Sequence, residues 1–545
     1  MKRSLLLRSA VARAPALRAP WAARATPGLG TLATRLLPWV ALGAIVAGAL
    51  FLRLFRLDGS IIYYPDTYGQ LRAVDNLLSG SVPISYHYPP GVALFLAPVF
   101  AFFPNTIQTM QATIIAASIA LVVLAYVATI VTTGERRAAL VFAAAVAISA
   151  ALVFYSRVAL FDVINTLLIA LSLFLAPYAL RRGPAVLLPY VLLVFTTLTV
   201  RHTNLVLLPI LFVASLPAGS WSLQTMLRHL RSRAVVTVGL LLLALYIAYV
   251  ATAIESLSRF TNSQGSSVID LSGFLPRLGQ YVQASLIGYG EEFNWLLSSV
   301  AAIVLVLAAV GAQHLWRTNR GMLVPIIMLL VVWSPVHAAY LFFASRYTLP
   351  AFYFVLMLAT VGLSVSIQRA GRLDDVRQRF RLRSALALAV TMFVGLQIII
   401  HIDYLQQWPE RVADNVERSY GEIRPILEDL DGTNSVLLSS QALAVDRANP
   451  EMTTYDLITH SETYGINDDS IDRLLAYVEE QQADGKTVYY YYTQFEVEQP
   501  RLRNYELGFD AYFVALRQEF SIRLLAYPTE RPERLYIIEP LPANE

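Results

Sequence analysis

The residues best suited to chemistry lie at the ends of apolar segments rather than within them. Asp66 stands in the first long polar interval, which runs from Tyr63 to Gly91. Three basic residues follow in short turns between later apolar segments: Arg157, Arg201 and Arg346. Arginine binds phosphate oxyanions bidentately and stays ionised, and a carboxylate can accept a proton from a hydroxyl or amine nucleophile. Together they indicate attack of an acceptor on a carbon attached to a lipid phosphate.

Further polar residues near these groups are candidates for the same cavity: His87, Tyr88, Asp162, His202 and Tyr347. Plainer interpretations stay open for every one of them. An arginine at the end of a span is often an interfacial anchor, and the histidines and tyrosines fit the same interfacial belt. Asp162 could instead pair with Arg157 and cap the helix that follows, and Asp66 could be a helix N-cap.

The composition places these groups in a membrane protein. Of the 545 residues, 56% are hydrophobic and 15% are charged, and the mean hydropathy is +0.53. These values exclude an ordinary soluble protein and indicate an integral membrane protein, with the lipid bilayer and no nucleic acid as partner. The lack of cysteine excludes disulfides and thiol catalysis. We predict no metal site, because no close cluster of histidines and carboxylates has ligand spacing.

A membrane-spanning helix needs about 20 apolar residues, and about eleven such segments are predicted. They cover residues 36–55, 107–132, 138–155, 161–180, 186–200, 203–216, 234–253, 293–313, 322–343, 348–367 and 384–402. Residues 92–103 are apolar but short, which indicates a re-entrant or interfacial segment. Arginines gather in alternate loops, at residues 136–137, 181–182, 228–233, 317–320 and 369–383. The positive-inside rule then puts the N-terminus inside and the C-terminus outside.

The chain is predicted to have three parts. Residues 1–35 form a basic cytoplasmic tail, although their richness in arginine and alanine is also that of an organellar transit peptide. Residues 36–403 form the transmembrane domain, with an external loop over residues 57–105. Residues 404–545 have the composition of a soluble domain. In this last part we predict a small external α/β layer, with a helix over 467–482 and strands over 435–440, 487–493 and 534–538.

The order of the polar motifs resembles that of a known group. The motifs are Tyr-Pro-Asp-Thr-Tyr (64–68), His-Tyr-Pro-Pro-Gly (87–91), Ser-Arg (156–157) with Asp162, Arg-His-Thr (201–203) and Arg-Tyr-Thr-Leu-Pro (346–350). In this order and on one side of the membrane, they resemble the membrane glycosyltransferases with the C-type fold (GT-C). The nearest likeness is to the protein O-mannosyltransferase and aminoarabinose transferase branch, and it covers about residues 36–367.

This resemblance implies a GT-C-like helical fold and a sugar donor carried on polyprenyl phosphate. Asp66 would be the catalytic base and Arg346 a phosphate ligand, with three weaker candidate ligands: Arg157, Arg201 and His87. It also implies direct displacement with inversion at the anomeric carbon. Many members have Asp-Glu in the first loop, whereas Thr67 follows Asp66 here. The role of a second carboxylate, and of a divalent cation bound to it, therefore stays open.

The sequence thus predicts a hexosyl- or pentosyltransferase of the cytoplasmic membrane. It would move a sugar from a polyprenyl-phosphate donor to a lipid, glycan or protein acceptor at the outer face. The alternative is a transporter or flippase of a lipid-linked or anionic substrate. Such carriers usually have polar groups near the bilayer midplane and repeated halves, and this sequence shows neither. A scaffold whose external domain binds partners would leave Asp66 and the arginines unexplained.

Overall fold

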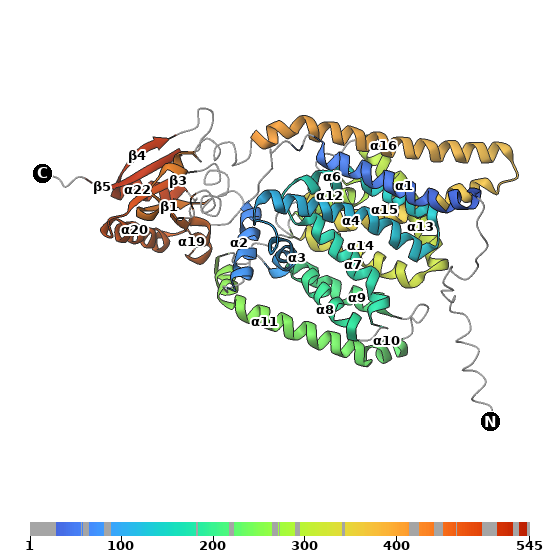
Figure 1. Ribbon diagram of the computed structural model, residues 1–545, viewed down its shortest axis with the longest axis horizontal. Helices are drawn as coiled ribbons and strands as arrows, with labels where there is room; N and C mark the ends of the chain where they lie inside the picture. Colours follow the sequence, from blue (N-terminus) through green and yellow to red (C-terminus); the bar gives the residue numbers. More distant parts are fainter. Residues whose placement is uncertain are drawn as a thin grey trace, which may run out of the picture.

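Apolar helices of membrane-spanning length dominate the structure (Figure 1). The computed structural model describes residues 29–55, 57, 65–80, 89–180, 184–216, 223–263, 271, 273–288, 295–339, 344–413, 425–440, 449, 451–464, 466–492, 510–526 and 534–541. Within these ranges, eight helices are long and apolar enough to cross a bilayer, or nine if one bent pair counts as a single span. The predicted polytopic helical class is confirmed.

The helical elements follow one another along the first three quarters of the chain. The first group is α1 (Leu29–Leu54), α2 (Pro65–Ser79), α3 (Pro90–Phe100), α4 (Ile107–Thr133), α5 (Arg136–Ile148), α6 (Ala150–Arg157), α7 (Asp162–Ala179) and α8 (Pro184–Leu198). The second group is η1 (His202–Val206), α9 (Leu207–Ser215), α10 (Leu223–Leu230), α11 (Arg233–Ser263), α12 (Phe274–Ile287), α13 (Trp295–Thr318), α14 (Arg320–Ala338), η2 (Ser345–Thr348), α15 (Leu349–Gly371) and α16 (Val376–Ala413). Figure 1 shows α1 and α16 along one side of the bundle and α11 along the opposite side.

Three apolar segments are shorter than a full crossing. The predicted spans over 186–200 and 203–216 form short apolar helices over Ala185–Leu198 and His202–Ser215. The segment predicted as re-entrant or interfacial forms α3, which has 11 residues. At about 1.5 Å per residue α3 extends about 17 Å, which is well below the roughly 30 Å of a bilayer core. Two of the eleven predicted segments therefore form helices shorter than a full crossing, within the residues that the structure describes.

One predicted span is bent in the middle. Residues 138–155 fall on α5 and α6, which meet at an angle of 51°. The backbone leaves helical geometry at Ser149, with φ −60° and ψ 117°. The Ser149 hydroxyl oxygen then accepts a hydrogen bond from the Leu152 N–H and caps α6. Because α6 is only eight residues long, this bend decides where the residues at its end lie.

Helix α15 is the centre of the bundle. In its most apolar window 89% of the residues are buried, and buried side chains of α5, α7 and α13 belong to the same core cluster. Gly362 of α15 lies against the backbone of α13 at Leu307, and Gly311 of α13 lies against the backbone of α15 at Leu358. A Cβ at either glycine would overlap these carbonyl oxygens, so glycine lets the two helices pack backbone to backbone.

The C-terminal part forms a five-stranded sheet with order β2-β1-β3-β5-β4. Its elements are β1 (Ser435–Ser439), β2 (Thr453–Asp456), α19 (Leu457–Tyr464), α20 (Asp468–Ala483), β3 (Thr487–Tyr492), α22 (Asp510–Glu519), β4 (Phe520–Ala526) and β5 (Arg534–Pro540). Strands β2, β1 and β3 are parallel to one another. Strand β5 is antiparallel to both of its neighbours, β3 and β4. The predicted helix is confirmed as α20, and the three predicted strands as β1, β3 and β5. Figure 1 shows the sheet beside the helical bundle, and α19 contacts α11.

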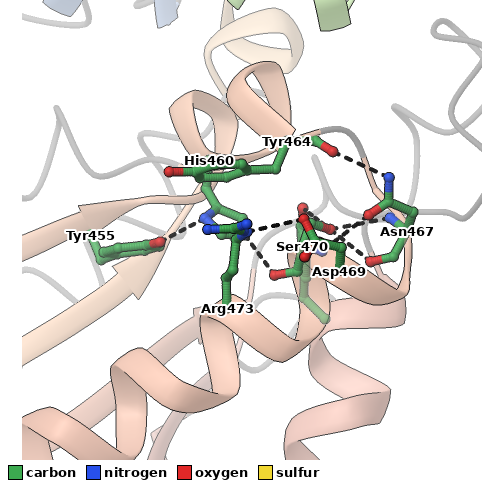
Figure 2. A network of polar contacts seen from close by, with 8 residues as sticks. Tyr455, His460, Tyr464, Asn467, Asp469, Ser470 and Arg473 are labelled. Carbon is green, nitrogen blue, oxygen red and sulfur yellow. Dashed lines mark hydrogen bonds and ion pairs between the residues drawn. The ribbon is translucent and has the colours of Figure 1, made fainter.

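A buried histidine joins β2, α19 and α20 in this sheet domain (Figure 2). The Ser470 carbonyl lies 2.8 Å from Nε2 of His460, and the Tyr455 hydroxyl lies 2.6 Å from Nδ1. A carbonyl only accepts, so Nε2 carries the proton and the Tyr455 hydroxyl donates to Nδ1. Burial lowers the pKa of His460 below its ordinary value of 6.5, and the charge of Arg473 lowers it further. The folded domain therefore holds His460 neutral.

This neutral histidine predicts a loss of stability in acid. Below pH 6.5 the unfolded chain protonates His460 while the folded domain resists protonation, so the free energy of unfolding should fall as the pH drops below that value. Above it, His460 should contribute no pH dependence. Calorimetric unfolding of the purified chain between pH 5 and 8 measures this, with His314→Gln on α13 as the control. The same acid slope in His460→Gln as in the wild type would contradict the assignment.

Candidate functional site

The helix that carries Asp66 is fixed to the turn between α6 and α7. Asp66 lies in the first turn of α2, and its side chain lies outside the described residues. The next residue, Thr67, is fully buried, and its hydroxyl donates a 2.7 Å hydrogen bond to the Ala159 carbonyl. Ala159 lies between Arg157 and Asp162 in the chain. The first-loop helix therefore begins beside two of the predicted site residues.

The other end of the first loop is fixed to the end of α8. The Gly91 N–H donates a 3.0 Å hydrogen bond to the Thr199 carbonyl. A Cβ at Gly91 would overlap backbone atoms of Thr196, Thr199 and Val200. Only glycine permits this approach, which puts the start of α3 against the residues that lead into Arg201. The motif that ends at Gly91 is thus next to the motif that starts at Arg201.

Replacing Gly91 tests how closely α3 and α8 approach. Gly91→Ala should lower the free energy of unfolding by about 1–3 kcal/mol, because the new methyl group meets fixed backbone rather than a flexible side chain. Thermal unfolding of the detergent-purified protein measures the change. Gly239→Ala on α11 is the matched control, since nothing lies within 4 Å of its added Cβ. Equal unfolding curves for the two variants would contradict the packing described.

Arg201 joins α7 to the turn before α15. Its guanidinium forms an ion pair with Asp162, the first residue of α7, and Asp162 is 2% exposed. The same guanidinium lies 4.0 Å from the ring centroid of Tyr347 and 4.7 Å from that of Phe161. Both distances are those of cation–π contacts. The alternative pairing of Asp162 with Arg157 was wrong: its partner is Arg201, and the N-cap of α7 is Phe161.

Helix α6 is joined to the same turn. The Tyr155 hydroxyl lies 2.7 Å from the Ser345 hydroxyl at the start of η2. Trp333 of α14 donates a 2.7 Å hydrogen bond from Nε1 to the Tyr347 carbonyl. The guanidinium of Arg346 lies 5.3 Å from the Tyr347 ring centroid. The turn that carries Arg346 is thereby fixed from two sides.

The site thus brings together Asp162, Arg201, Arg346 and Tyr347 from three separate turns. Arg157 is buried at the end of α6, and its carbonyl accepts a hydrogen bond from Gln111 of α4. His202 points elsewhere: its ring stacks on Tyr249 of α11, with the centroids 6.3 Å apart and the planes at 17°. His87 and Tyr88 lie outside the described residues.

Sequence reasoning missed the residues that hold these turns together. These residues are uncharged, and their role depends on partners far away in the chain. They are Thr67, Phe161, Tyr155, Ser345 and Trp333. Asn204 of η1 is a further case, since its side-chain amide donates to Asn165 of α7 and to the Thr197 carbonyl. Only Thr67 left a signal, because it stands where the resembling sequences have a second carboxylate.

The described residues around Thr67 do not fit a divalent cation. The Thr67 hydroxyl is used as a donor to Ala159, and it cannot replace a carboxylate as an anionic ligand. In the part of the chain that the structure describes, no group of three or more histidine, aspartate and glutamate residues is placed to hold a metal.

Comparison with known proteins identifies the fold. No protein-family model and no curated protein matches the sequence. Two solved structures of ArnT from Cupriavidus metallidurans match over 92% of this chain and 98% of theirs. The apo structure is 13% identical with a TM-score of 0.60, and the one bound to undecaprenyl phosphate is 14% identical with a TM-score of 0.57.

An archaeal structure matches as well. The oligosaccharyltransferase AglB from Archaeoglobus fulgidus, in complex with an inhibitory peptide and a dolichol-phosphate, is 10% identical with a TM-score of 0.54. That match covers 94% of this chain and 75% of the AglB chain. ArnT and AglB share the GT-C fold, and these matches extend over most of the chain rather than over a few helices. The fold implied by the order of the polar motifs is confirmed: this chain has the GT-C fold.

Proposed function

We propose that this protein is a membrane glycosyltransferase that takes its sugar from a polyprenyl-phosphate donor. The acceptor is a lipid, glycan or protein at the outer face of the cytoplasmic membrane. The N-terminus then lies inside and the C-terminal sheet domain outside, in keeping with the arginine-rich loops between alternate helices. One observation carries the proposal: Arg201 contacts Asp162 and Tyr347 at the same end of the bundle where Thr67 fixes the helix of Asp66.

The proposed mechanism assigns one role to each part of the site. Asp66 accepts the proton of the acceptor hydroxyl or amine as that atom attacks the anomeric carbon. The bond between the anomeric carbon and the phosphate oxygen breaks, and the electron pair leaves on polyprenyl phosphate. Attack from the face opposite the leaving group inverts the anomeric centre. Asp66 then carries the proton, which passes to solvent.

The basic residues divide into two roles in this proposal. Arg346 and Arg157 bind the phosphate and stabilise the charge that develops on the leaving group, with His87 as a further candidate. Arg201 already shares its charge with Asp162 and stacks on Tyr347. We therefore assign to Arg201 the task of holding the turn of Arg346 in place. Its Nε is buried and has no hydrogen-bond partner among the described residues.

The ligands of the structural neighbours support a lipid-linked donor. The ArnT structure holds undecaprenyl phosphate and the AglB structure holds a dolichol-phosphate, and both compounds are polyprenyl phosphates. A donor of this kind also suits a site at the membrane surface, because the lipid chain stays in the bilayer while the sugar reaches the polar turns.

Transfer and transport can be separated in one experiment. The wild-type protein is reconstituted in liposomes with polyprenyl-phosphate-linked hexoses and pentoses that carry a radiolabelled sugar, and with lipid, glycan and protein acceptors. We expect label in an acceptor and an equal amount of free polyprenyl phosphate. Label that crosses the bilayer while still attached to its carrier would instead establish a transporter. Neither transfer nor crossing with any donor would refute the proposed function.

A further inference from the structure

The bend between α5 and α6 leaves buried backbone groups without hydrogen-bond partners in their own helices. A helix that ends leaves its last carbonyls without intrahelical donors, and a helix that begins leaves its first N–H groups without acceptors. At Ser149 both situations occur within a few residues, inside the protein, where unpaired backbone groups are costly. The side chains that satisfy these groups therefore determine the bend.

Three of these groups are bound by side chains from α1 and α16. Arg53 of α1 donates a 3.1 Å hydrogen bond to the Ala147 carbonyl. His401 of α16 donates from Nε2 to the Ile148 carbonyl at 3.0 Å. Gln397 of α16 accepts from the Ala150 N–H at 2.8 Å. Arg53 and Gln397 are almost completely buried.

A third residue of α16 contacts α6 beyond the bend. The ring of Tyr404 stacks on Phe154, with centroids 4.3 Å apart and planes at 25°. Gln397, His401 and Tyr404 are spaced four and three residues apart, so they lie on one face of α16. This row of side chains, here called the α16 row, contacts α6 from its first residue to the turn before its end.

The position of α6 decides the position of the site. Tyr155 of α6 reaches the turn of Arg346 through Ser345, and α6 ends at Arg157. Ala159 lies two residues after Arg157, and its carbonyl accepts the hydrogen bond from the Thr67 hydroxyl. An eight-residue helix is about 12 Å long, so a change of direction at Ser149 moves its far end by several ångströms.

We infer that Gln397 and His401 of α16 are positioning residues that set the direction of α6 and thereby place Arg157 and the turn that binds α2. They touch neither the donor nor the acceptor. The inference rests on the proposed function for its catalytic consequence, but the contacts themselves are open to a test that needs no activity. The sheet domain follows α16 in the chain, so the same helix connects that domain to the site.

Hydrogen–deuterium exchange of the reconstituted full chain tests this arrangement directly. Gln397→Leu and His401→Leu should raise exchange in peptides over residues 148–162 by about tenfold, as expected for the loss of one buried hydrogen bond. Exchange in α15 should not change. Gln397→Glu retains an acceptor for the Ala150 N–H, and His401→Gln retains a donor for the Ile148 carbonyl, so both should restore protection. Ile399→Ala is the matched control, because Ile399 lies on α16 and is 54% exposed.

Transfer from the same panel of polyprenyl-phosphate sugars gives the second readout. The two leucine variants should lose about tenfold or more in kcat, since α6 no longer holds Arg157 in place. Unchanged exchange over residues 148–162, or an equal rise across all helices, would overturn the inference. Raised local exchange with normal transfer would overturn it too. Raised local exchange in a protein whose wild type transfers no sugar would uphold the contacts and refute the proposed function instead.

Discussion

Asp66→Asn is expected to reduce sugar transfer by about 10²–10⁴-fold, the contribution of a general base. Asparagine keeps the size and much of the hydrogen bonding of aspartate, but its amide cannot accept the proton of the acceptor. Binding of the donor should change little, because the proposed mechanism assigns the phosphate to the arginines rather than to Asp66. The loss should therefore appear in kcat, which is measured with saturating donor in reconstituted membranes.

Asp75→Asn provides a matched control for this result. Asp75 lies further along α2, and its Oδ1 accepts a hydrogen bond from Asn105. Asparagine at position 75 still offers an oxygen to Asn105, so transfer should stay near the wild-type rate. Undiminished transfer by Asp66→Asn would move catalysis away from the first loop. Loss of transfer together with loss of donor binding would show that Asp66 binds the donor instead of activating the acceptor.

Asp162→Asn is expected to cost about 3–5 kcal/mol of stability, as does breaking other buried ion pairs from one side. Asp162 is 2% exposed and Arg201 is 13% exposed, so removing the carboxylate leaves a poorly solvated guanidinium. The turn of Tyr347, which stacks on that guanidinium, should also become mobile. Unfolding in detergent measures the stability. Transfer should fall as well, because Arg346 lies in the same turn as Tyr347.

The double variant Asp162→Asn with Arg201→Gln separates the ion pair from its surroundings. Because it removes both charges, it should be less destabilised than the sum of the two single variants. Strict additivity would mean that the pair does not couple α7 to Arg201. Arg523→Gln is the matched control, since Arg523 and Glu539 form an exposed pair on the sheet that should matter little.

The membrane helices were largely predictable because a long apolar run can be recognised from local sequence alone. Long apolar runs such as residues 107–132 have no other stable form in a bilayer, and α4 covers that run as expected. The capping chemistry of Asn467, Asp468 and Asp469 predicted the start of α20, and Asn467 is its N-cap. Strand β2 was missed because its residues are few and only half buried, so its sequence shows no apolar alternation.

The geometry of the candidate site was predictable only as a set of motifs on one side of the membrane. Which motif touches which depends on partners far apart in the chain. Asp162 lies five residues from Arg157 and was weighed as its partner, yet it pairs with Arg201, 39 residues away. The bend at Ser149 carries neither proline nor glycine, and its causes are side chains of α1 and α16. Local sequence cannot show such contacts.

The α16 row has a consequence for how the protein is made. Gln397 is 247 residues beyond Ala150, whose N–H it binds. Ribosomes release the N-terminal helices first, so α6 enters the membrane before α16 has been synthesised. Until then, the Ala150 N–H and the Ile148 carbonyl lack their partners on α16. A chain that stops before α16 would carry Asp66 and every arginine of the candidate site, yet its α6 would lack the contacts of Gln397, His401 and Tyr404. We therefore expect full transfer only once α16 is in place, and much slower transfer by unfinished chains.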